Sequence, residues 1–197
     1  MNPLFLPFLS YAVVTTFTPG PNNITASTIG IRFGYRRSLP FLTGMTLGFF
    51  SLMLFSGLLT DFLLRTYSVI APWVKWIGVT YMIWLGISLF LPQRTGSGKE
   101  EANSTFLSGL LLQYANPKLI LYGITIYTSF SPLIAGSITV AAVSATSLAI
   151  LGFTAGSLWS LTGSFLRRFL KNPRTLVTFN MVMALMLAWC AWSIARH

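Results

Sequence analysis

Residues 18–23 read Thr-Pro-Gly-Pro-Asn-Asn and interrupt the first long apolar stretch of the chain. Proline lacks a backbone donor and its ring clashes with the preceding turn, so this segment must break a helix. As helices, residues 4–17 would rise about 21 Å and residues 23–31 about 13 Å, and only together would they cross a bilayer core of about 30 Å. The break is therefore expected inside the membrane, where irregular backbone must be buried in protein or line a cavity. The alternative is a short first helix with an ordinary re-entrant turn.

The composition is that of a membrane protein. Of the 197 residues, 54% are hydrophobic and 8% are charged, against about a quarter charged in soluble domains, and the mean hydropathy is +0.70. A formal net charge of +10 could suit nucleic acid, but the apolar content favours anchoring charge beside a membrane and no nucleic-acid partner. One cysteine (Cys190) and one histidine (His197) exclude an internal disulfide and leave no metal site. The predicted fold class is all-α and integral to the membrane.

Polar residues divide the chain into six apolar stretches, and six spans of about 20 residues would use roughly 120 residues and leave short loops. The first stretch follows no positive region and precedes no small-residue cleavage site, so we expect it to be retained. Residues 1–197 are thus expected to form a single domain of six transmembrane helices, with the first and fourth broken by proline motifs. The stretches are residues 4–31, 39–60, 67–91, 105–130, 134–163 and 176–195.

Lysine and arginine gather in alternate connections. Those after the first, third and fifth stretches hold Arg32, Arg36, Arg37, Arg94, Lys99, Arg167, Arg168, Lys171 and Arg174. The opposite side holds Arg65, Lys75 and Arg196. Because cytoplasmic loops are enriched in positive residues, the richer connections are expected to be cytoplasmic and both termini periplasmic.

The polar linker 92–104 divides the chain into two parts, about 1–91 and 105–197, each with three expected helices. An odd number of helices gives the parts opposite orientations, the inverted repeat common in secondary transporters. Two features recur: a proline break in the first helix of each part, and a pair of glycines four residues apart in the second. Those pairs are Gly44 with Gly48 and Gly152 with Gly156. The alternative is coincidence in a glycine-rich membrane protein.

The second break reads Asn116-Pro117-Lys118 and begins about 16 Å into the fourth helix, near the bilayer middle. Asparagine is a good N-cap and proline suits the first helical position. A half-helix beginning here would point free backbone N–H groups and a positive dipole end into the membrane, where Lys118 adds a full charge. An amino-acid carboxylate or a small organic anion would complement it. The alternative is that Lys118 reaches an interface with water.

Polar side chains flank both breaks. Gln113 and Tyr122 are candidates to bind a substrate ammonium or side chain, whereas Tyr114 is as well explained by packing or an interface. Asn22 and Asn23 either bind substrate or satisfy backbone groups that the prolines free. The candidate substrate-binding residues are Thr18, Pro19, Gly20, Pro21, Asn22, Asn23, Gln113, Asn116, Pro117, Lys118 and Tyr122.

Enzyme chemistry finds little support in this sequence. The acidic residues, Asp61, Glu100 and Glu101, fall at helix ends or in loops and form no catalytic pair or metal-ligand set. No glycine-rich nucleotide loop is present, so we expect no cofactor and no ATP-driven mechanism. A gradient must then supply the energy, with the proton carried on the substrate amine or by Asp61. The glycine pairs are best read as close helix packing, within one chain or between two, so monomer and homodimer both stay open.

These motifs together resemble the lysine-exporter superfamily, in its homoserine/threonine-efflux branch. The similarity covers nearly the whole chain, and residues 18–24 with 120–123 resemble most the members that export cysteine and O-acetylserine. Those members carry an acidic residue before a proline near the start of the third helix, where this chain has Ala71 before Pro72. The motifs are Pro19-Gly20-Pro21-Asn22, Gly44 with Gly48, Gly78-Val79-Thr80-Tyr81, Leu85-Gly86 and Asn116-Pro117-Lys118.

The resemblance implies a bacterial inner-membrane exporter of small neutral amino acids, a secondary transporter that uses the proton-motive force by alternating access. Its expected partners are a zwitterionic amino acid, protons and the lipid bilayer. The rival interpretations are export of another amino acid, such as homoserine, threonine or a basic one, a passive channel, and a non-transport role in assembly or lipid handling.

Overall fold

The computed structural model describes residues 3–90, 104–134, 137–167 and 173–196, without the side chains at 67, 71, 173, 174 and 176. Every regular element in these ranges is a helix, which confirms the all-α class. The predicted linker 92–104 lies almost entirely outside them, as do Arg94, Lys99, Arg168, Lys171 and His197. The helices are α1 Phe5–Phe17, α2 Pro21–Phe33, α3 Tyr35–Leu58, α4 Thr60–Ser88, α6 Phe106–Ala115, α7 Pro117–Ser129, α8 Ser131–Ile134, α9 Ile138–Leu166 and α10 Pro173–Arg196.

Both predicted helix breaks are present. Helix α1 ends at Phe17, Thr18 and Gly20 are extended, and α2 begins with Pro21 at its first position. Helix α6 ends at Ala115, and an extended Asn116 separates it from α7. In each case proline opens the second half-helix, because its fixed φ suits that position and its missing N–H is not needed there. We refer below to residues 18–20 as the first break and to Asn116 as the second break.

Three helical segments in the described residues are individually long and apolar enough to cross a membrane: Tyr35–Leu58, Ile138–Leu166 and Val177–Arg196. Phe5–Phe17 and Phe106–Ala115 are shorter apolar helices, as expected of half-spans. The observed bounds otherwise shift the predicted ones by a few residues, the largest change being α4, which begins at Thr60 rather than 67. Six spans in two inverted repeats remain a prediction, as does their orientation.

Helices α2, α3, α6 and α9 pack closely, and we call them the packed group. Glycines let the backbones of these helices come into direct contact. A Cβ on Gly44 in α3 would lie 1.9 Å from the Phe106 carbonyl oxygen in α6, and one on Gly30 in α2 would lie 2.1 Å from the Ser160 carbonyl oxygen in α9. The predicted glycine pairs of α3 and α9 therefore serve packing within the chain.

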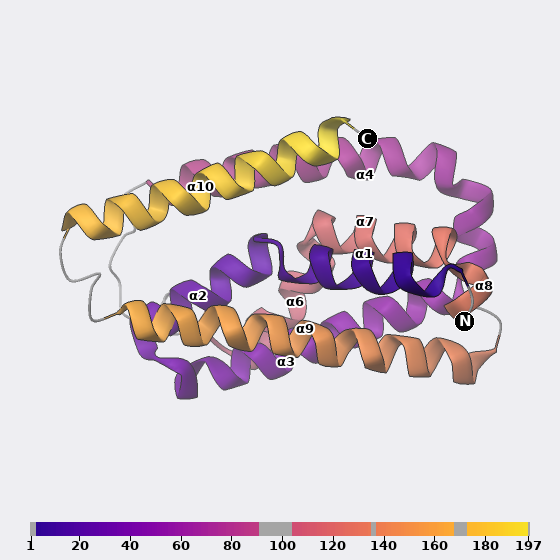
Figure 1. The fold of residues 1–197 in the computed structure, drawn as a ribbon, viewed down its shortest axis with the longest axis horizontal. Helices are drawn as coiled ribbons and strands as arrows, with labels where there is room; N and C mark the ends of the chain where they lie inside the picture. Colours follow the sequence, from indigo (N-terminus) through magenta and orange to yellow (C-terminus); the bar gives the residue numbers. More distant parts are fainter. Residues whose placement is uncertain (1–2, 91–103, 135–136, 168–172, 197) are drawn as a thin grey trace.

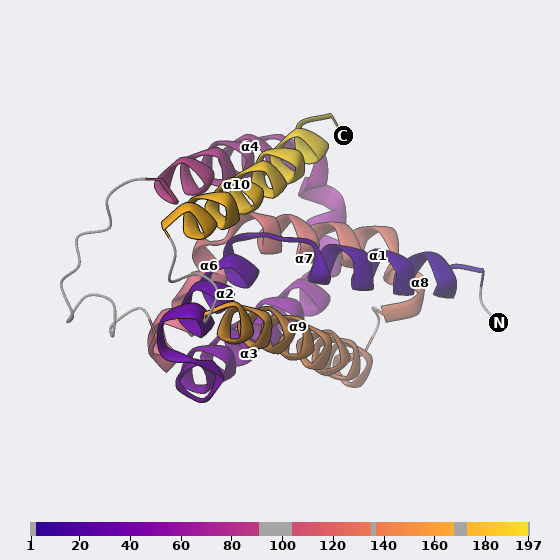
Figure 2. The same cartoon turned by 60° about the vertical axis from the view of Figure 1, so that its left-hand side comes forward.

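Helices α4 and α10 lie side by side along one flank of the molecule, in both views (Figures 1 and 2). This α4–α10 pair contacts the remainder mainly where α4 meets α7. Figure 1 shows α1 and α7 adjacent, between that pair and α9. The arrangement matters for the site because α1 and α7, which adjoin the two breaks, lie beside the α4–α10 pair.

Candidate substrate-binding site

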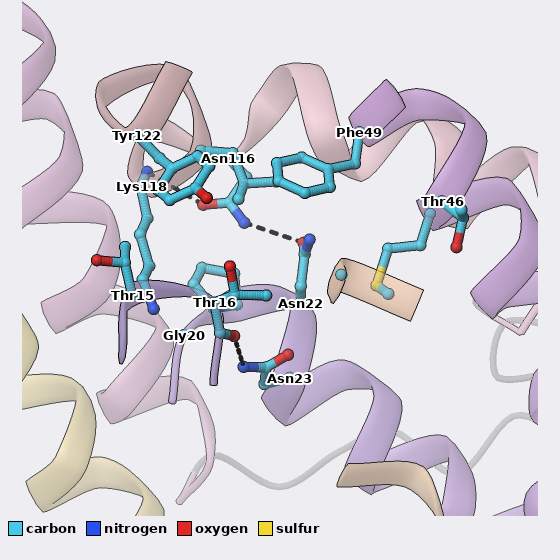
Figure 3. A pocket seen from close by; sticks show the side chains of 14 residues that line it. Thr15, Thr16, Gly20, Asn22, Asn23, Thr46, Phe49, Asn116, Lys118 and Tyr122 are labelled. Carbon is cyan, nitrogen blue, oxygen red and sulfur yellow. Dashed lines mark hydrogen bonds between the residues drawn. The ribbon is translucent and has the colours of Figure 1, made fainter. Parts of the chain in front are cut away.

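The two breaks, about a hundred residues apart in sequence, meet in space (Figure 3). The Lys118 ammonium, from the first turn of α7, donates to the Thr18 carbonyl oxygen at 2.8 Å. The Asn116 amide of the second break donates to Asn22 Oδ1 at 2.9 Å, which joins it to the first turn of α2. The motifs that the sequence singled out are thus parts of one cluster.

The side-chain amides of Gln113, Asn22 and Asn116 form a network of hydrogen bonds within the protein. Asn22 donates to Gln113 Oε1 at 2.6 Å, and Gln113 donates in turn to the Gly109 carbonyl at 2.8 Å. Gln113 is 0% exposed and Asn116 is 1% exposed. Their role in this structure is to hold α2 against α6, so direct contact of Gln113 with a substrate is not favoured by its position.

Asn116 also caps α7, as predicted. Its side-chain oxygen accepts from the Lys118 N–H at 3.1 Å, and its carbonyl accepts from the N–H groups of Leu119 and Ile120. The expectation of free backbone N–H groups at this end was therefore wrong, because these groups donate hydrogen bonds to the cap residue. The positive dipole end remains, and the Lys118 ammonium is the group there that can face an anion.

A helix break leaves backbone carbonyls without their usual helical partners. At and just before the first break, each carbonyl of residues 16 to 19 accepts a hydrogen bond from a side chain. The donors come from four different elements, α2, α7, α9 and α10. Asn23 donates to the carbonyls of Thr16 and Thr18 at 2.9 and 3.0 Å, Trp159 to Phe17 at 3.2 Å, Lys118 to Thr18 at 2.8 Å, and the Cys190 thiol to Pro19 at 3.1 Å. Asn23 thus satisfies freed backbone, one of its two predicted roles, while Trp159 and Cys190 had no sequence signal.

Lys118 is buried, with 9% of its surface exposed, so it does not extend to an interface with water. Its partner is a neutral carbonyl rather than a carboxylate. Asp61, the acidic residue within the described ranges, is exposed in the first turn of α4 and lines neither of the cavities described next. A buried cation without a counter-ion is costly, which is why such residues in membrane proteins usually serve function.

Two adjoining cavities meet at Lys118, Tyr122 and Thr15, which line both. The smaller, about 30 Å³, lies between the breaks and has room for about one water-sized group. The larger, about 710 Å³, lies between α1, α7 and the α4–α10 pair and is large enough for an amino acid. The larger one brings in lining residues that sequence reasoning did not assign to the site, including Tyr11, Ser68, Lys75, Trp76, Cys190 and Ser193.

Two hydroxyls at the smaller cavity have no hydrogen-bond partner of ordinary geometry within the described residues. They are Thr16 Oγ1 and Tyr122 Oη, and Tyr122 is only 2% exposed. Buried polar atoms are normally paired, so unpaired ones beside a cavity mark a place where a polar group can bind. The sequence signal for this part of the site was the polar pair Thr15-Thr16, which precedes the first break by one residue.

The predicted site residues divide into two sets by position. Those that line a cavity are Thr18, Gly20, Pro21, Asn22, Asn23, Asn116, Lys118 and Tyr122. Those that line neither are Pro19, Gln113 and Pro117, which shape the breaks and the amide network. Substrate contact for any of them remains a prediction.

Comparison with known proteins places these motifs in a family. Residues 13–197 match the family model described as LysE type translocator. The chain is 37% identical over 187 residues to the cysteine/O-acetylserine efflux protein of Klebsiella pneumoniae, covering 93% of each chain. It is 34% identical over 194 residues to proteins of that name from Escherichia coli K12 and Shigella flexneri, covering 97% of each chain. No solved structure gives a significant match. The resemblance read from the motifs is confirmed, and the chain belongs to the LysE family of translocators.

Proposed function

We propose that this protein is a secondary-active exporter of small neutral amino acids of the cysteine and O-acetylserine kind, in the inner membrane of a bacterium. The family and the names of its relatives support amino-acid efflux and a transporter rather than an enzyme. The observation that carries the proposal is the position of Lys118. It joins the two helix breaks, is buried with no carboxylate partner among the residues that the structure describes, and lines a cavity of about 710 Å³.

In the proposed mechanism the substrate carboxylate binds the Lys118 ammonium at the positive end of α7. The cavity then opens in turn to each side of the membrane, and the proton-motive force drives the cycle as antiport. The predicted inverted arrangement of two three-helix repeats would suit such a cycle, because it gives one fold two related openings. In this mechanism the α4–α10 pair moves against the packed group, which it contacts through a buried cluster formed by Ile24 of α2 with Met183 and Leu187 of α10.

A basic amino acid is the rival substrate. Lys75 and Lys118 both line the larger cavity, and the described lining has no carboxylate to receive a second cationic group. Like charges in a low-dielectric site repel strongly, so a dicationic substrate fits poorly. A role in assembly or lipid handling would require neither a break in the first helix nor a polar cavity, and the chain has both.

The proposal is tested by reconstituting the purified protein in liposomes loaded with labelled O-acetylserine. We expect an imposed pH gradient to stimulate efflux. Unlabelled O-acetylserine should inhibit the efflux by competition, and arginine should not. Lys118→Ala should abolish it, while Arg65→Ala, which removes an exposed cation of α4 outside both cavities, should leave it unchanged. Substrate counterflow separates a carrier from a passive channel. Wild-type efflux rates in Lys118→Ala, with normal membrane insertion, would reject the assigned role.

A further inference from the structure

The hydrogen bond between Lys118 and Thr18 spans the site. It joins the beginning of α7 to the end of α1, and both residues line the larger cavity. Helix α1 presents its carbonyl end here, which carries partial negative charge, and α7 presents its amino end, which carries partial positive charge. A cation therefore already occupies the negative end of α1, and it belongs to the protein's own lysine.

The Thr18 carbonyl oxygen accepts two donors, Asn23 and Lys118. A carbonyl oxygen has two lone pairs, so it is saturated as long as Lys118 stays in place. If Lys118 turns toward an anion, one lone pair of Thr18 becomes available in the cavity. The vacated position is suited to a small cation, because the end of a helix and an oxygen acceptor converge on it.

We propose that a zwitterionic substrate inserts between these two groups and replaces their bond. Its carboxylate binds the Lys118 ammonium, and its α-ammonium binds the Thr18 carbonyl oxygen where the lysine was. This inference rests on the proposed function and adds the subsite for the ammonium. The exchange leaves neither group unpaired, and it gives the buried lysine an anionic partner in place of a neutral carbonyl.

Lys118 lines both cavities, so there is open space beside it into which its side chain can turn. Its side chain lies against Gly20, where a Cβ would be 2.8 Å from Lys118 Cδ and 3.1 Å from Nζ. The absence of a side chain at this position leaves room for the lysine beside the first break. The substrate's own side chain then points toward the larger cavity, whose tyrosine, threonine, serine and tryptophan residues suit an uncharged polar tail.

The proposal predicts a narrow chemical class of ligand: small molecules with both a free α-ammonium and a free α-carboxylate. A molecule with only one of these groups leaves either the Lys118 ammonium or the Thr18 carbonyl without its partner. Because a hydrogen bond to a charged group contributes about 1.5–3 kcal/mol, loss of either group should weaken binding about tenfold to a hundredfold.

The experiment compares three ligands of nearly the same shape in the purified full-length protein under reducing conditions. Cysteine has both groups, 3-mercaptolactate has a hydroxyl in place of the ammonium, and cysteinamide has an amide in place of the carboxylate. Each competes with labelled O-acetylserine efflux from liposomes, and each is also tested for the shift it causes in the unfolding temperature, which reports binding without transport. We expect both analogues to be weaker than cysteine by about tenfold or more.

Lys118→Ala then assigns the groups to their subsites. In this variant the difference between cysteine and cysteinamide should disappear, because the carboxylate has lost its partner, while the difference between cysteine and 3-mercaptolactate should persist. The thermal shift supplies this result even if the variant does not transport. If 3-mercaptolactate competes as well as cysteine in the wild type, the ammonium subsite is rejected although efflux stands. If the wild type exports none of these amino acids, the proposed function itself fails.

Discussion

The packed group and the α4–α10 pair are built by different kinds of contact. Within the packed group, helices meet backbone to backbone: a Cβ on Gly109 would lie 2.1 Å from the Phe41 carbonyl oxygen, and one on Gly163 would lie 2.2 Å from that of Ser27. Between α4 and α10 the spacing is ordinary, since a Cβ on Gly86 would be 3.7 Å from its nearest atom, the Ala184 carbonyl oxygen of α10. The tighter glycine of α4 is Gly78, where the helix meets α7 and a Cβ would be 3.3 Å from Pro117 Cβ. The contact between α4 and α10 therefore has room for an added methyl group at Gly86, whereas the glycine contacts of the packed group have none.

This difference indicates which parts of the molecule behave as one body. Close-packed interiors transmit displacement rather than absorb it, so the four helices of the packed group should move together. The larger cavity lies between the α4–α10 pair and the helices α1 and α7, and Lys118 lines it. The first break is bonded both to the packed group, through Asn23 of α2, and to the α4–α10 pair, through Cys190 of α10.

The largest expected effect comes from a methyl group inside the packed group. Gly44→Ala places a Cβ 1.9 Å from a backbone oxygen of α6, which has no rotamer with which to escape. We expect a loss of about 3 kcal/mol or more in stability, at the upper end for overpacking. The measurement is thermal unfolding and size-exclusion behaviour in detergent.

Gly86→Ala is the matched control, and its stability should lie within about 0.5 kcal/mol of the wild type. Equal unfolding temperatures for the two variants would break the comparison, because both regions would then tolerate the same methyl group.

The next effect concerns transport rather than stability. Gly20→Ala adds a methyl group that meets Lys118 at Cδ and Nζ, the flexible end of its side chain. The lysine can move, so the protein should fold, but its ammonium should leave the Thr18 carbonyl. Because small misplacements in a binding site are costly, we expect KM for efflux to rise about tenfold to a hundredfold. Initial efflux rates at several internal substrate concentrations test this, again beside Gly86→Ala. An unchanged KM would show that the position of Lys118 at the first break is not needed.

The helix breaks could be predicted from the sequence because proline chemistry is local. Two prolines around Gly20 end a helix in any surroundings, and Asn116 before Pro117 caps the next one without help from elsewhere.

The partners of the freed carbonyls could not be predicted. Trp159 and Cys190 lie 142 and 171 residues from the carbonyls that they bond, and their neighbours in sequence carry no mark of that role. Asn23 had two equally reasonable roles, and only its distance to Thr16 and Thr18 distinguishes them. Long-range pairing depends on how helices pack, and apolar helices offer little periodic signal to fix their rotation.

A smaller effect on stability is expected at Trp159, inside the packed group. Trp159→Phe keeps an aromatic ring but leaves the Phe17 carbonyl without its donor, which should cost about 1–3 kcal/mol. Trp73→Phe is the control, because that ring is 73% exposed on α4. The unfolding temperature should fall only in the first variant, with KM for efflux little changed. Equal unfolding temperatures in the two variants would mean that the Trp159 bond adds nothing to the packed group.

The smallest effect is expected at Cys190. Its thiol donates a hydrogen bond that joins α10, in the α4–α10 pair, to Pro19 in the first break. A thiol is a weak donor, so Cys190→Ala should cost at most about 1 kcal/mol of stability, and Cys190→Ser should restore a stronger donor to the Pro19 carbonyl. If the pair moves against the packed group during transport, this bond must break in each cycle. Strengthening it by about 0.5–1.5 kcal/mol should then slow maximal efflux about twofold to tenfold in Cys190→Ser, with no such slowing in Cys190→Ala. Identical maximal rates in both variants would indicate that α10 and the first break move together, and the boundary between the two bodies would have to be drawn elsewhere.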